Sequence, residues 1–336
     1  MVEEATECRS SPRTHNYYPD PTSALGCPPE LYLHQYPQLY SGFSKIGCPV
    51  FYSKPGQLDI DGLECLTSLK GILKYHWHVM QHDYQKRLLQ FKKENPNFKR
   101  FECVSVLDLK HLTVSKISSR SLDITKEQAT IDSLCFPETM NKMIIVNAPR
   151  FFSATWSIIK GFIDARTSAK VELFSSSSAA FKCMKEIIDV DQIPSDYGGT
   201  GESTITTLEK MSEGNKIQTQ VLYVKTYDST KVEIGPGEEA SFGVYTRATG
   251  GAKVHILDEG KKDLVPPVLV KHEKRSGEKG ESDDHFPPTK VDLTVTGKIQ
   301  GPKTVKVKAI AAGGGSVFAT AQNFLVVSSI TKIDSN

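Results

Sequence analysis

Long apolar runs are absent from this sequence, and none approaches the roughly 20 residues that a membrane-spanning helix requires. Residues 1–15 are polar and lack the apolar centre of a signal peptide. An excess of either charge is also absent, because 41 basic and 39 acidic residues leave a net charge of +2. This balance gives no support to electrostatic binding of nucleic acid. These absences predict a soluble, cytoplasmic protein whose contact with membranes is peripheral.

Clustered metal ligands are scarce as well. The seven cysteines include no C-x-x-C pair, and none follows Cys183, which disfavours a secreted disulfide framework or a zinc module. His78 and His82 have the i, i+4 spacing of a helical metal pair, but no carboxylate or cysteine joins them at a recognisable interval. We interpret them as solvated or hydrogen-bonded helix residues, and we expect neither a metal nor a cofactor.

Catalytic motifs are missing too, because the chain contains no G-x-S-x-G, no H-E-x-x-H and no Walker sequence. The serines at 175–178 follow an expected strand, where a hydrolase could keep its nucleophile, but no histidine and acid are placed to pair with them. We therefore expect a protein that is not an enzyme and has no catalytic residues. A small-molecule hydrolase on an α/β core remains the rival interpretation.

The middle of the chain, residues 137–199, has a regular alternation of elements. Residues 143–146 are a short Ile- and Val-rich run that suits a buried strand, and residues 170–174 are again strand-like. Between them the apolar positions recur at helical spacing, which places Phe152, Trp156, Ile159, Phe162 and Ile163 on one face. Strand, helix and strand in about forty residues indicate a βαβ unit in a sheet that is buried on both faces.

The heavy apolar face of this helix has two interpretations. In the first, the helix simply covers the sheet. In the second, it lines a cavity and can move, and Thr167 and Lys170, which stand just beyond its expected end, would then face an anionic group at the rim. Spacing alone does not decide between them.

Several motifs in this stretch match a known family in order. They are Pro137-Glu138, the Asn147-Ala-Pro149 turn, Phe152, Trp156, the 162–170 block, and Ile193-Pro194 followed by Tyr197-Gly198-Gly199. Together they resemble the CRAL-TRIO lipid-binding domain, within the phosphatidylinositol-transfer proteins and the supernatant-protein-factor or tocopherol-associated group. The resemblance continues more loosely upstream to about Pro28. It implies an α/β fold, a mixed sheet flanked by helices with an apolar pocket.

The resemblance also implies residue roles. The helix that carries Phe152, Trp156, Ile159, Phe162 and Ile163 corresponds to the gate of the lipid pocket. Glu138, Thr167 and Lys170 correspond to positions that contact the inositol phosphate; the alternative from sequence alone is an ordinary Glu–Lys ion pair beside a helix-end threonine. The family has a helical segment before position 28 that is missing or replaced here, and no residue takes over its basic headgroup contact.

The expected function is non-enzymatic binding and transfer of a phospholipid, with phosphatidylinositol as the preferred ligand. The alternative is a trafficking adaptor or sensor that binds an isoprenoid such as squalene or tocopherol. Either protein would be cytoplasmic and transiently at membranes, for example those of the Golgi.

The chain divides by composition. We expect a disordered segment over 1–27, the CRAL-TRIO domain over 28–201, a polar linker over 202–216 and a β-rich domain over 217–330 with a mobile loop at 259–290. Strand-like runs at 217–227, 239–248, 253–257, 291–296, 304–310 and 317–327 predict an antiparallel sandwich. Its position after the first domain resembles a GOLD (Golgi dynamics) domain, which implies a protein or membrane partner.

Two groups of basic residues have more than one interpretation. Lys92, Lys93, Lys99 and Arg100 form a local cluster that is either solvated surface or a contact with anionic membrane. In the 304–310 run, Lys306 and Lys308 alternate with valines, which places the lysines on the solvent face of a strand, where they are either solvated surface or a contact with a membrane or protein partner.

Overall fold

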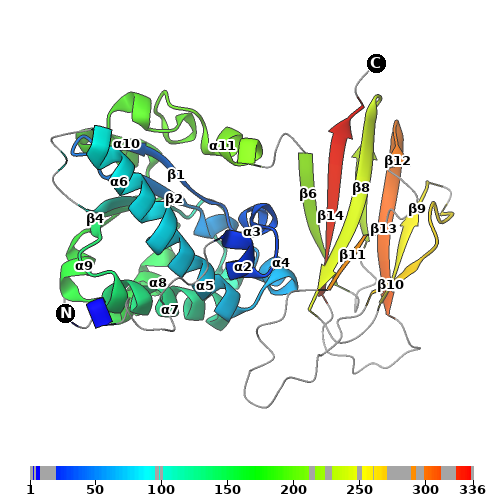
Figure 1. Ribbon diagram of the computed structural model, residues 1–336, viewed down its shortest axis with the longest axis horizontal. Helices are drawn as coiled ribbons and strands as arrows, with labels where there is room; N and C mark the ends of the chain where they lie inside the picture. The colour runs from blue at the N-terminus through cyan, green and yellow to red at the C-terminus, as the bar shows by residue number, and fades with distance from the viewer. Residues whose placement is uncertain are drawn as a thin grey trace, which may run out of the picture. The chain divides into compact units, whose positions relative to one another are not determined.

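The computed structural model describes residues 3, 5–7, 20–94, 98, 101–211, 216–223, 229–247, 252–259, 261–270, 289–292, 299–311 and 323–333. The chain forms two compact units, which Figure 1 shows. The first comprises Met1–Leu25, Gln35–Ile60 and Leu69–Leu208, and the second comprises Gly26–His34, Asp61–Ser68 and Glu209–Asn336. Two short segments of the second unit therefore differ from the expected division. Most of Gly26–His34 and all of Asp61–Ser68 fall within 28–201, the range expected for the first domain.

The first unit is built on a five-stranded mixed sheet. The strands lie in the order β1 (Gln38–Phe43), β2 (Pro49–Ser53), β3 (Cys103–Asp108), β4 (Met140–Val146) and β5 (Val171–Leu173). The edge strand β1 is antiparallel to β2, whereas β2, β3, β4 and β5 are mutually parallel. This arrangement confirms the expected mixed α/β sheet.

One face of this sheet is filled by side chains. Val104 and Val106 of β3 and Ile144 and Val146 of β4 are buried in one cluster with residues of helix α10 (Ser177–Ile187). The residues between them alternate to the opposite face, as the pleat of a strand requires. That opposite face lies toward α5, α7 and α8 (Figure 1) and carries the site described below.

The remaining helices follow the connections between the strands. They are α2 (Pro21–Leu25), α3 (Pro29–Gln35), α4 (Ile60–Leu66), α5 (Leu69–His78), α6 (Gln85–Glu94), α7 (Ser119–Cys135), α8 (Phe152–Ile159), α9 (Ala165–Ala169) and α11 (Thr204–Met211). From Leu69 to Glu94 the chain is helical, with a π-helical segment, Val79–Tyr84, between α5 and α6. Among the described residues, no helix has both the length and the apolar content to cross a bilayer.

The prediction that residues 1–27 are disordered is wrong for residues 20–27, which the structure describes. Helix α2 begins with a proline, and Asp20 accepts the backbone N–H of Ser23 at 2.9 Å, so both signals of a helix start are present. Ala24 and Leu25 are buried, and α2 contacts α5. The apolar end of the segment is therefore held by packing. Most of residues 1–19 lie outside the described part of the chain.

The range 202–216, which was expected to be a polar linker, contains helix α11 near its start. Thr204, at the start of α11, is fully buried, and both its backbone N–H and its hydroxyl donate to Asp196. Leu208 packs against the core under α10. These contacts hold the helix to the first unit, whereas residues 212–215 are not described.

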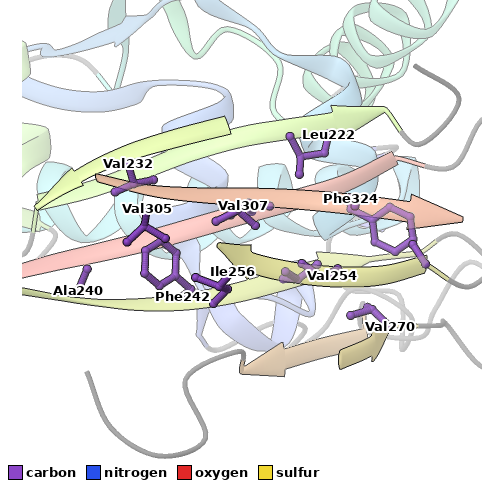
Figure 2. Close-up of a cluster of buried hydrophobic side chains, with 14 of the residues drawn as sticks. Leu222, Val232, Ala240, Phe242, Val254, Ile256, Val270, Val305, Val307 and Phe324 are labelled. Atoms are coloured by element: carbon purple, nitrogen blue, oxygen red, sulfur yellow. The ribbon is translucent and has the colours of Figure 1, made fainter. Parts of the chain in front are cut away.

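The second unit contains two antiparallel sheets. The first has the order β10 (Val268–Val270), β9 (Ala252–Leu257), β13 (Lys303–Ala311) and β7 (Ser229–Ile234). The second has the order β11 (Thr289–Asp292), β8 (Glu238–Thr246), β14 (Asn323–Lys332) and β6 (Lys216–Tyr223), with β12 (Ile299–Gln300) pairing with β8. Side chains from both sheets fill one core, which includes Phe242 and Phe324 (Figure 2).

Two expectations for this unit need correction. The last described strand is Asn323–Lys332, which continues beyond the expected end at 327 and sets Phe324, Val326 and Ile330 into the core, whereas positions 317–322 of the expected run lie outside the described part. The expected mobile loop 259–290 contains β10, which pairs with β9 and buries Val270 completely. Residues 271–288 lie outside the described part.

Candidate functional site

A cavity of about 810 Å³ lies on the open face of the mixed sheet, entirely within the first unit. Its floor includes Ser105 and Leu107 of β3 and Met143 and Ile145 of β4, the residues that alternate with the packed valines of the other face. Helices α5, α7 and α8 supply its walls. The volume is near the upper end of the range for small-molecule pockets. The interior on this face is therefore not filled by the protein's own side chains.

Helix α8 forms one apolar wall. Phe152 and Thr155 are buried, and Trp156 and Ile159 are partly buried while lining the cavity. Thr155 was not singled out from the sequence, because a threonine does not contribute to an apolar stripe. Leu109, Ile145 and Ala148 pack with Phe152 and fix the start of the helix on the sheet. This gives α8 an anchored N-terminal end.

The expected helix over 152–163 is shorter than its spacing suggested. Helix α8 ends at Ile159, a 3₁₀ turn covers Lys160–Phe162, and Ile163 is extended. Gly161 is a poor helix former, and Asp164 begins a new helix, so the chain breaks here. Phe162 and Ile163 still line the cavity, from the turn and from the extended residue instead of from one helical face.

The polar residues Glu138, Thr167 and Lys170 line the same cavity, so the structure brings all eight sequence-derived positions to one site. Lys170 donates from Nζ to the carbonyl oxygen of Met140 at 2.8 Å, and the same Nζ lies 3.4 Å from Glu138 Oε2. The Lys170 side chain is 31 % exposed and that of Glu138 is 63 % exposed, which places this ion pair at the rim.

The hydroxyl of Thr167 already has a partner. It donates to Asp164 Oδ2 at 2.5 Å, while Asp164 Oδ1 accepts the backbone N–H groups of Arg166 and Thr167. These hydrogen bonds, first that from the Thr167 hydroxyl, lower the pKa of Asp164. Sequence reasoning missed Asp164 and Arg166, both of which line the cavity. An aspartate directly before a helical segment is an N-cap signal that could have found the first of them.

A second polar group lies on the helical wall. His76 Nε2 of α5 is 2.6 Å from Asp132 Oδ1 of α7, and both residues line the cavity. The rings of His78 and His82 are tilted against each other with centroids 5.2 Å apart. In the described part of the chain, no group of three or more His, Cys, Asp or Glu side chains is arranged to hold a metal.

The serines at 175–178 serve helix α10. Ser176 is its N-cap, and its hydroxyl lies 2.9 Å from that of Ser178. Ser177 donates to Asn147 Oδ1 at 3.1 Å, and Asn147 donates to the buried Asp108 at 2.7 Å. Among the residues that the structure describes, no histidine is hydrogen-bonded to these serines, whose own hydrogen bonds cap a helix and brace the ends of β3 and β4.

Comparison with known proteins agrees with this geometry. The CRAL/TRIO domain family profile matches residues 33–199. The phosphatidylinositol/phosphatidylcholine transfer proteins SFH4 and SFH13 of Arabidopsis thaliana are 30% and 31% identical, each over 51% of this chain and over 28% and 27% of their own lengths. The SEC14 cytosolic factor of Candida glabrata is 29% identical over 50% of this chain and 54% of its own length. The chain thus spans about a quarter to about half the length of these relatives.

Proposed function

We propose that the chain, whose residues 33–199 match the CRAL/TRIO domain family, binds a phospholipid in its cavity, preferably phosphatidylinositol, and exchanges it between membranes. The exchange breaks no covalent bond, so it needs no catalytic residue and no cofactor. Relatives named as phosphatidylinositol/phosphatidylcholine transfer proteins support this proposal. The single observation that carries it is the hollow face of the mixed sheet.

The energy of the acyl chains explains why a hollow is needed. Two tails contain on the order of 30 methylenes, and exposing each to water costs roughly 0.8 kcal/mol, which sums to more than ~20 kcal/mol. A shallow groove would leave much of this surface wet. A cavity with the apolar side chains of α8 on one side and those of β3 and β4 on the other removes it from water.

The rim suits a polyol phosphate better than a bare anion. Lys170 supplies a positive charge for the phosphate, and Thr167 supplies a hydroxyl donor beside it. Glu138 and Asp164 are carboxylates that accept hydrogen bonds from ring hydroxyls. When a phospholipid enters, contacts with its headgroup would replace the Thr167–Asp164 and Lys170–Glu138 contacts. Each of these polar side chains would then keep a hydrogen-bonding partner.

The gate would move at the break after α8. Phe152 anchors one end of that helix, whereas at Gly161 an added Cβ would meet no atom within 4 Å. The chain there is a 3₁₀ turn followed by an extended residue, so few hydrogen bonds oppose a change of backbone angles. Outward movement of Trp156 and Ile159 would open the apolar interior to a membrane.

The second unit would recruit a protein or membrane partner. Its two antiparallel sheets and its place after the lipid-binding domain are the features in which it resembles a GOLD domain and the supernatant-protein-factor group. With this partner the protein would act in the cytoplasm and transiently at membranes such as those of the Golgi.

A second candidate function has one observation in its favour. The rim side chains Lys170 and Thr167 are already paired with Glu138 and Asp164, so the site stays satisfied when the ligand has no charged headgroup. This favours a sensor or adaptor that holds an isoprenoid such as squalene or tocopherol and transfers little of it.

Two measurements separate these functions. Mass spectrometry of the lipid that co-purifies with the full chain identifies the ligand, and we expect phosphatidylinositol. Transfer of labelled phosphatidylinositol between vesicles, at catalytic amounts of protein, tests the exchange. A protein that retains an isoprenoid and accelerates no phospholipid transfer is the sensor, and the transfer proposal then fails.

A further inference from the structure

The sheet β10-β9-β13-β7 has one face that the core does not use. Val305, Val307 and Ala309 of β13 are buried between the two sheets, and Figure 2 shows the two valines among the core side chains. Successive side chains of a strand point to opposite faces. Lys306 and Lys308 therefore project away from the core, as the alternation in the sequence predicted.

The strand register gathers further lysines on this outer face. Lys306 stands directly opposite Lys231 of β7, and Lys308 stands opposite His255 of β9. Lys253 of β9 pairs with Ile310 and is thus diagonal to Lys308. Opposite and diagonal side chains in a sheet lie roughly 5–8 Å apart. We name Lys231, Lys253, Lys306 and Lys308 the outer lysine face.

These four positive charges have little compensation among the described residues. Within the part of the chain that the structure describes, none of them forms an ion pair, and the carboxylate of Asp263 lies 3.0 Å from His255 Nδ1. Glu233 stands at one end, opposite Thr304. Like charges placed directly opposite each other destabilise a sheet, so the Lys231–Lys306 pair disfavours folding. The chain has a net charge of only +2, which means that positive charge is concentrated here beyond the average of the molecule.

We propose that the outer lysine face docks on an anionic membrane surface. Acidic headgroups form a plane of negative charge, and a sheet face with lysines on three neighbouring positions presents a complementary array. Leu269 of β10 stands opposite Lys253 and is 56% exposed, which adds an apolar side chain at the edge of the face. This docking is separate from the proposed lipid transfer and does not depend on it.

The test is sedimentation of the full chain with vesicles of phosphatidylcholine, with and without phosphatidylserine. We expect binding only when phosphatidylserine is present, and we expect high salt to abolish it. Each lysine near such a surface contributes roughly fivefold to the affinity. The triple variant Lys231→Gln, Lys306→Gln and Lys308→Gln should thus bind about a hundredfold more weakly. Its thermal stability should stay equal or rise, because the opposed lysines no longer repel each other.

Two control variants keep the result specific. Lys216→Gln with Lys332→Gln removes two lysines from the other sheet of the same unit and should change binding little. Replacing the same three lysines by arginine should preserve binding, since charge and not the ammonium geometry is at issue. Equal vesicle binding by the glutamine variant, or no preference of the native chain for phosphatidylserine, would overturn the proposal. A face that ignores vesicles but binds an acidic polypeptide would overturn it as well.

Docking and lipid transfer can fail independently. A Trp156→Asp chain, in which the cavity wall is disrupted, should still sediment with phosphatidylserine vesicles. Loss of docking in that variant would assign the vesicle binding to the first unit instead.

Discussion

In the second unit, Phe242 and Phe324 both lie in the core between two antiparallel sheets and leave almost no exposed surface. In the first unit, the face of the mixed sheet toward α8 carries apolar residues such as Leu107, Met143 and Ile145, yet a cavity of about 810 Å³ lies on that face. Both interiors draw on Val, Ile, Leu and Phe. The difference lies in what covers the sheet: a second sheet with interdigitating side chains in one case, and helices held away from the strands in the other.

An apolar sheet face therefore has to be covered, but its sequence does not determine whether protein side chains or a ligand cover it. The same sheet of the first unit makes the point internally, because α10 packs directly on Val104 and Ile144 while α8 stands over Leu107 and Met143 across a cavity. A close-packed core gains stability from every contact, whereas a hollow gives up part of that stability to admit a ligand. The predictions below test this contrast.

The largest effect is expected from Trp156→Asp. A carboxylate in the apolar wall would need to be desolvated by an acyl chain, so loading of any lipid should be abolished. The measurement is lipid content by mass spectrometry together with vesicle transfer. Ile158→Asp is the matched control, because Ile158 is 52% exposed on the same helix and does not line the cavity. Undiminished transfer by the Trp156 variant would remove α8 from the pathway.

The two interiors should also respond differently to truncation. Phe242→Ala should destabilise the second unit by about 3–5 kcal/mol, because it opens a cavity in a filled core. Trp156→Ala should cost less than about 2 kcal/mol in the ligand-free protein, since its side chain already borders open space. Urea unfolding of both variants measures the contrast. Equal costs would mean that the first unit is as closely packed as the second.

A smaller effect is expected at the rim. Lys170→Ala should weaken phosphatidylinositol pickup roughly tenfold, the value of a hydrogen bond to a charged group, and should spare uncharged ligands. Competition between labelled phosphatidylinositol and an uncharged lipid reports the ratio. Lys182→Ala, on the outer side of α10, is the control and should change neither. Equal loss for both ligands would indicate a folding defect.

The smallest effect concerns Asp164. Its pKa is lowered, first by the hydrogen bond from the Thr167 hydroxyl, so Thr167→Val should raise this pKa toward its ordinary value. A carboxylate whose folded pKa lies below the unfolded value stabilises the fold above the unfolded pKa, and this contribution is lost as the pH falls through the folded pKa. The native chain should therefore be slightly more stable than the variant at pH 7, and this difference should disappear as the pH falls below the folded pKa of Asp164. NMR titration of the Asp164 carboxyl carbon detects the change, and an unshifted curve would show that the bond is not formed in solution.

Much of the first unit was accessible from the sequence because its elements carry their own signals. The spacing of Phe152, Trp156 and Ile159 predicted α8, and the Ile- and Val-rich run at 143–146 predicted β4. The helix break at Gly161 and the helix within 202–216 were missed. In both places the helix boundary is set by hydrogen bonds to a carboxylate, Asp164 in the first case and Asp196 in the second. Such bonds can end or start a helix without changing the spacing of apolar residues, so the spacing alone did not reveal them.

The sequence by itself determined which residues are apolar, with what period, and in what order the strands and helices follow. It also carried the motifs that place Glu138, Thr167 and Lys170 together. Only the tertiary structure decided that one face of the mixed sheet is filled and the other hollow, and that Lys231 stands opposite Lys306. The reason is physical: period and composition act within one element, whereas helix-to-sheet separation and strand register are set between elements by the packing of the whole fold.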